Sequence, residues 1–86
     1  MSQLEKLRAT ILAGTSDTNI DFPTLRKLLK RLGFAERVRG SHPIFSHKDM
    51  EEILSLQPQS GKARPYQVKQ VRQVLVKYRL GDADVD

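Results

Sequence analysis

The sequence predicts an α+β domain in which helices cover one face of a three-stranded antiparallel sheet. Three observations lead to this prediction. Apolar residues recur at helical spacing over residues 2–13 and 21–33, the apolar period changes to two after Gly33, and a helical period returns after Pro65. The expected order is therefore two helices, three strands and a helix, and short connections between the strands favour a meander.

Both N-terminal helices have recognisable boundaries. Ser2 followed three residues later by Glu5 is a capping-box pattern for a helix over residues 2–13. Asp21 can cap a second helix, and Gly33 is expected to end it in the left-handed conformation. The second helix carries one apolar stripe, formed by Leu25, Leu28, Leu29 and Leu32.

The middle of the chain predicts three short strands, and Gly40 with Ser41 forms the tight connection between the first two. In the third strand, Leu54 and Leu56 are expected to alternate with Ile53 and Ser55. The expected strands span residues 34–39, 42–46 and 52–57.

A last helix is expected to begin at Pro65 and to end at Gly81. Its inward stripe consists of Val68, Val71, Leu75 and Tyr78, whereas Lys69, Arg72, Lys77 and Arg79 are expected to lie largely outside. We expect a single domain over residues 1–81, followed by a disordered acidic tail over residues 82–86.

The charge of the chain favours a polyanionic or acidic partner. Fifteen Lys and Arg residues stand against ten Asp and Glu residues, for a net charge of +5. Three of those acids lie in the last five residues, so residues 1–81 carry fifteen bases and seven acids, or +8. Nucleic acid, an anionic membrane surface or an acidic protein would be attracted to such a domain.

Composition also limits the chemistry. With 86 residues the domain has no room for a buried cofactor cavity, and the absence of cysteine excludes disulfides and thiolate sites. Two histidines without clustered carboxylates make a preformed metal site unexpected, so we predict neither a cofactor nor a metal. The polar start does not resemble a signal peptide and no apolar run could span a membrane, so a cytoplasmic location is expected.

His42 is the first candidate for chemistry. It follows the Gly40–Ser41 turn and is expected to project from a hairpin instead of from a core stripe. Imidazole exchanges protons near neutral pH without a large change in its environment. A surface histidine is more often simply solvated, so the position alone does not establish a catalytic role.

A motif surrounds His42. It consists of Leu32-Gly33-Phe34, then Arg39-Gly40-Ser41-His42 with Ile44-Phe45, and a helix that opens at Pro65-Tyr66. This pattern resembles the HicA family of bacterial toxins, which are the small ribonucleases of HicAB toxin–antitoxin systems. The resemblance covers about residues 21–80 and leaves the helix within residues 1–14 as an accessory element. It implies a fold similar to the double-stranded RNA-binding domain, a catalytic role for His42, messenger RNA as substrate and a HicB-like antitoxin as partner.

Given an RNA substrate, basic and polar residues near the hairpin and in the following loop become candidates for RNA contact. They are Arg37, Arg39, Ser41, His47, Lys62 and Arg64. His47 is also a candidate for a second proton-exchanging group, and the loop that carries Lys62 and Arg64 is expected to be flexible. Tyr66 could stack on a base or hydrogen-bond a phosphate, but we favour packing of its ring between the last helix and the sheet.

The sequence leaves an enzyme and two alternatives open. The first is a metal-independent endoribonuclease that cuts messenger RNA with a histidine general base and is blocked by its antitoxin. The alternative is a non-catalytic RNA-binding module of the same fold, or a structural subunit whose activity has lapsed. Pro43 and Gln59 keep these alternatives open because they depart from the family pattern, and glutamine cannot exchange protons.

Overall fold

The computed structural model describes residues 2–40 and 42–80, and the predicted α+β order is confirmed within them. The expected acidic tail over residues 82–86 and the expected helix stop at Gly81 lie outside the described residues. No helix in the described ranges is both long and apolar enough to cross a bilayer. The elements are α1 (Gln3–Ala13), α2 (Phe22–Arg31), β1 (Ala35–Arg39), β2 (His42–Ser46), β3 (Ile53–Ser55) and α3 (Pro65–Lys77).

The first two helices begin where the sequence predicts. The Ser2 hydroxyl accepts a hydrogen bond from the Glu5 amide at 3.1 Å, and the Asp21 carboxylate accepts one from the Thr24 amide at 3.1 Å. After α2, Gly33 has a φ of 99°, which only glycine adopts without strain. The chain can therefore turn sharply from α2 into the sheet.

The sheet is an antiparallel meander in the order β1-β2-β3. Arg39 lies opposite His42 at the rung that closes the first hairpin, and Phe45 lies opposite Glu36 and Leu54. β3 is shorter than the expected strand over residues 52–57. Among the described residues, the Leu56 amide, which donates to the Pro43 carbonyl, is the one group beyond Ser55 that still bonds to β2. The inward-facing Phe45, Leu54 and Leu56 are all buried, which confirms the predicted alternation.

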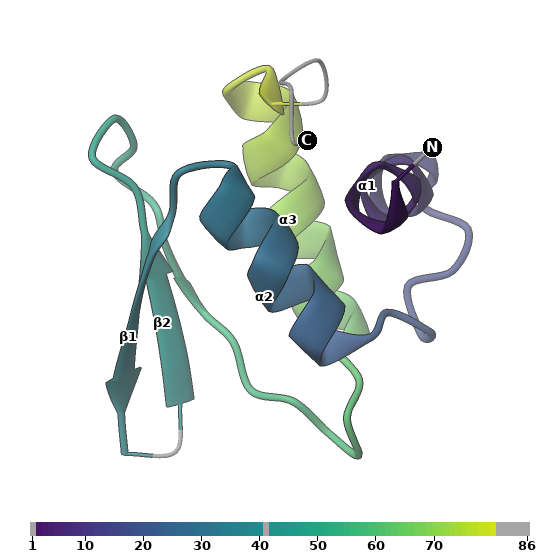
Figure 1. Ribbon diagram of the computed structural model, residues 1–86, viewed down its shortest axis with the longest axis horizontal. Coiled ribbons are helices and arrows are strands. Elements are labelled where there is room, and N and C mark those ends of the chain that lie inside the picture. The colour runs from purple at the N-terminus through teal and green to yellow at the C-terminus, as the bar shows by residue number, and fades with distance from the viewer. Residues whose placement is uncertain (1, 41, 81–86) are drawn as a thin grey trace.

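The molecule has three layers. Figure 1 shows α2 and α3 as a helix pair on one side of the sheet, with α1 on the far side of this helix pair. α1 contacts both of these helices, and α3 contacts β3. Ile11 of α1 is fully buried in the same core as the strand residues, so α1 is part of the single hydrophobic core. Within residues 2–40 and 42–80, no helix covers the other face of the sheet, as predicted.

Two side chains of α3 do not lie where the sequence places them. Tyr66 is 56% exposed, so the expected packing of its ring against the sheet is wrong. Arg72 was expected outside, but its side chain is 23% exposed and holds α1 and the α1–α2 loop against α3. It donates to the Ile11 carbonyl at 2.7 Å and pairs with Asp17.

The segment between β3 and α3 is tied down by backbone hydrogen bonds and does not match the expected flexible loop. Gln59 and Lys62 exchange two hydrogen bonds around a tight turn, in which Ser60 and Gly61 both have positive φ. The Gly61 carbonyl accepts from the Phe22 amide, and the Ala63 amide donates to Ile20. This segment is thereby fixed to the start of α2.

Candidate nucleic-acid interface

Four parts of the fold lie at one end of the molecule. They are the end of β1 with the start of β2, the start of α2, the 58–64 segment and the start of α3, all at the lower end of Figure 1. The β2–β3 connection and the ends of α2 and α3 lie at the opposite end. Residues far apart in the sequence, such as Arg39 and Lys62, therefore lie at the same end of the molecule.

His42 is the first residue of β2 and is half-buried. Its cross-strand partner is Arg39, and directly opposed residues in an antiparallel pair hold their Cβ atoms about 4.5–5.5 Å apart on one face of the sheet. Among the residues that the structure describes, no side chain hydrogen-bonds to the imidazole. No hydrogen bond from a side chain in that part of the structure therefore occupies the imidazole nitrogens.

Two exposed arginines extend the positive charge along β1. Arg37 and Arg39 are separated by two positions, so both project from the sheet face opposite the helices. Glu36, between Ala35 and Arg37, has its side chain only 8% exposed on the helix side, which fixes this alternation. Ser41, the other predicted contact in this hairpin, lies outside the described residues.

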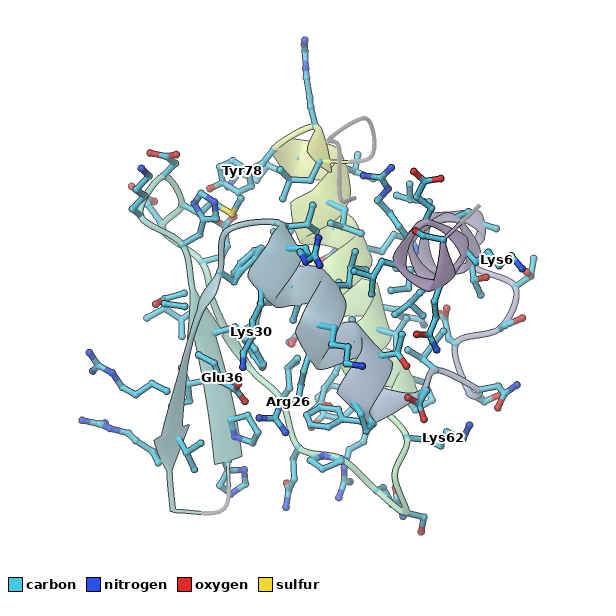
Figure 2. All side chains as sticks on the ribbon, viewed as in Figure 1. Lys6, Arg26, Lys30, Glu36, Lys62 and Tyr78 are labelled. Atoms are coloured by element: carbon cyan, nitrogen blue, oxygen red, sulfur yellow. The ribbon has the colours of Figure 1, made fainter. Side chains whose placement is uncertain are left out.

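The tied 58–64 segment brings further cations to the same end. Lys62 is exposed and labelled near the lower end of Figure 2. Hydrogen bonds from Thr24 lower the pKa of Asp21, and the charge of Lys62 lowers it further. Arg64 precedes α3, and its Nε is buried without a hydrogen-bond partner among the described residues. Arg64 as a whole is half-buried, so part of its side chain reaches the surface at this end.

His47 lies away from this end. It follows the last residue of β2, so about 17 Å of strand separates it from His42 at ~3.3 Å per residue. Its side chain is 12% exposed, and its ring packs edge-on against Phe34 at 5.2 Å. Its Nδ1 accepts from the Asp49 amide, and its Nε2 would lie 2.8 Å from a Cβ at Gly33. His47 thus fills the corner between α2 and the sheet.

Sequence reasoning missed the contact that holds the hairpin to the helices. Figure 2 shows Arg26 and Lys30 of α2 pointing toward Glu36 of β1. Arg26 Nε lies 2.8 Å and Lys30 Nζ 2.9 Å from the carboxylate oxygens. The hydrogen bond from Arg26 is the main cause that lowers the pKa of Glu36, and Lys30 adds to it. Two cations one turn apart on α2 indicate that a carboxylate could pair with both of them. The sequence alone did not show that this carboxylate belongs to Glu36.

Comparison with known protein families identified a related family. The family model described as the HicA toxin of bacterial toxin–antitoxin systems matches residues 22–77, from the start of α2 to the end of α3. The match covers the sheet and both helices packed on it, and α1 lies outside it. No curated protein and no solved structure matched the chain.

Proposed function

The chain belongs to the HicA family of toxins of bacterial toxin–antitoxin systems, and from this premise we propose that it is a metal-independent endoribonuclease that cuts messenger RNA. The observation that best supports the proposal is the position of His42 at the closing rung of the β1–β2 hairpin, opposite Arg39. The imidazole of His42, which can exchange a proton, and the permanently charged guanidinium of Arg39 therefore lie on neighbouring strands at the surface.

In the proposed reaction, the His42 imidazole takes the proton of a ribose 2′-hydroxyl. The 2′-oxygen then attacks the adjacent phosphorus, the bond from phosphorus to the 5′-oxygen breaks, and the 5′-oxygen takes up a proton. The products are a 2′,3′-cyclic phosphate and a 5′-hydroxyl. Since RNA supplies its own nucleophile, one general base and nearby cations suffice, and such a base contributes about 10²–10⁴-fold.

The cations have two roles in this proposal. Arg39, across the strand from His42, stabilises the charge that develops on the phosphorane oxygens. Arg37, Lys62 and Arg64 hold neighbouring phosphates and fix the register of the strand without reading its sequence. The predicted contact at Ser41 remains part of the proposal. His47 is left out because its ring is packed at the other end of β2.

A second function is favoured by one observation. The described residues bring no second histidine near His42, and the structure describes Gln59 as an exposed residue whose backbone pairs with Lys62. A protein without a general acid could bind RNA through the same cations and leave it intact. Cleavage, and not binding, therefore decides between the two functions.

The test is incubation of a defined RNA with the native protein and three variants in the presence of a chelator. The native protein should shorten the RNA, and His42→Ala and His42→Gln should lower the rate by about 10²–10⁴-fold with unchanged circular dichroism. His47→Ala is the matched control: it should lower the unfolding temperature and leave the cleavage rate of the folded protein near native.

Induced expression provides the same test in cells. The native chain should arrest bacterial growth, and the His42→Ala chain should not. Intact RNA with the native protein would support the binding module, and full cleavage by a folded His42→Ala protein would place the base elsewhere.

A HicB-like antitoxin is the proposed partner, and the cytoplasm, where messenger RNA is translated in bacteria, is the proposed place of action. The antitoxin is expected to cover the His42 face of the sheet, which none of the described helices covers.

A further inference from the structure

Tyr66 differs from the other aromatic residues because its ring lies in solvent. All five aromatic residues are within the described part of the chain, and the three phenylalanines are buried. Tyr78 is half-buried, and its hydroxyl donates to the Glu52 carboxylate. Tyr66 alone among them is exposed, at 56%. An exposed ring is the surface on which nucleobases stack.

The position of the Tyr66 hydroxyl is partly fixed by the core. Gln67 is only 1% exposed, and its Nε2 donates a long hydrogen bond of 3.4 Å to the Tyr66 oxygen. Pro65 begins α3 directly before Tyr66, and its ring restricts the backbone there. A ring held in this way loses little conformational freedom when a ligand binds.

Positive charge lies on both sides of Tyr66 along the chain. Arg64 carries the buried Nε that has no partner among the described residues, and Lys62 is exposed on the tied segment. Lys69, one helical turn after Tyr66, is also exposed. An aromatic ring between cations, at the end of the molecule that carries His42, combines the two features of a single-strand binding surface.

We propose that Tyr66 is a stacking platform for an unpaired base of the RNA substrate, while Lys62 and Arg64 hold the adjoining phosphates. This inference rests on the proposed function and adds the substrate class, which is single-stranded RNA. In a duplex, each base already stacks on its neighbours, so its face is not available to a side chain. A fold similar to the double-stranded RNA-binding domain would suggest a duplex substrate instead. Binding of single-stranded and of duplex RNA must therefore be measured separately.

The experiment measures binding of the His42→Ala protein to a labelled single-stranded RNA and to a duplex that contains the same strand. On that background, Tyr66→Leu should weaken single-strand binding by roughly 5- to 150-fold, and Tyr66→Phe should stay near native because it keeps the ring. Val76→Ala, at a 64% exposed position of the same helix, is the matched control and should change nothing.

The salt dependence separates stacking from charge. Tyr66→Leu should leave the slope of log affinity against log salt unchanged, and Lys62→Gln should reduce it by about 0.7. Unfolding temperatures near native for the Tyr66 variants would exclude a folding defect. Equal loss of single-strand and duplex binding in Tyr66→Leu, or no loss in either, would overturn the proposal.

The native cleavage assay separates this inference from the proposed function. If the native protein cuts RNA and Tyr66→Leu cuts and binds as well as native, the stacking platform is wrong and the ribonuclease stands. If the native protein neither binds nor cuts RNA, both the proposed ribonuclease function and the stacking role of Tyr66 are wrong.

Discussion

The negative charge of Glu52 is expected to stabilise the folded protein through its contact with Lys77. It precedes β3, and its carboxylate accepts hydrogen bonds from Lys77 Nζ at 2.6 Å and from the Tyr78 hydroxyl. The hydrogen bond from Lys77 is the largest cause of a lowered pKa, which falls from its ordinary value of 4.5 to about 2. The same contact raises the pKa of Lys77. Glu52 thus joins the end of α3 to the start of β3.

The sign of the pH dependence follows from that lowered pKa. A carboxylate that is more acidic when folded stabilises the protein above its unfolded pKa, and this contribution is lost as the pH falls through the folded pKa. Glu52→Gln should therefore lower the unfolding temperature most above pH 4.5, and the two proteins should converge as the pH approaches about 2. Thermal unfolding followed by circular dichroism across this range is the measurement.

Glu51→Gln is the matched control, since Glu51 is exposed and adjacent to Glu52. Its unfolding temperature should follow the native curve at every pH. A difference between Glu52→Gln and the native protein that stays constant with pH would show that shape, and not charge, accounts for the contribution of Glu52.

Helix α1 lies outside the family match but contributes to the hydrophobic core, so the stability of the matched domain is expected to depend on it. The family match begins with α2, yet Ile11 of α1 is fully buried and its carbonyl accepts from Arg72 of α3. Ile11→Ala should destabilise the protein by about 2–5 kcal/mol, because it leaves a cavity between three helices. Urea unfolding with a fitted midpoint is the measurement.

The control uses the same side chain in a different place. Ile53 is 66% exposed on β3, so Ile53→Ala should change the free energy of unfolding by only about 0.5 kcal/mol. Similar losses at both positions would contradict the view that α1 is part of the core.

The elements could be predicted from sequence because their signals are local. The caps at Ser2 and Asp21, the stop at Gly33 and the change of period after it each depend on neighbouring residues. β3 is shorter than predicted because the length of a strand depends on its pairing with a neighbouring strand. Within the described part of the chain, β2 bonds to the residues beyond Ser55 through Leu56 alone.

The candidate site was less predictable because it depends on contacts between distant segments. The motif around His42 consists of neighbouring residues, and the family match confirms the resemblance to HicA toxins that this motif indicated. The sequence could not show that Glu36 pairs with α2, that residues 58–64 are tied to Phe22, or that Tyr66 stays in solvent. Each of these depends on where the chain returns in space.

At the scale of the whole molecule, charge and shape lead to the same face. Residues 1–81 carry fifteen bases and seven acids, and no helix in the part of the chain that the structure describes covers the sheet face with Arg37 and Arg39. An antitoxin with an acidic surface would associate rapidly with this face and exclude RNA by occupying it. Inhibition at a distance, through distortion of the hairpin, is the competing model.

Competition separates the two models. Labelled RNA is bound to the His42→Ala protein, and a HicB-like antitoxin is added in increasing amounts while the bound RNA is measured. Occupancy predicts complete displacement, with Arg37→Glu and Arg39→Glu each weakening the antitoxin. Lys6→Glu is the matched charge reversal, because Figure 2 places Lys6 on α1, on the far side of the helix pair from the sheet, and it should leave displacement unchanged. A stable complex of toxin, antitoxin and RNA would rule out occupancy, because one face cannot hold both ligands at once.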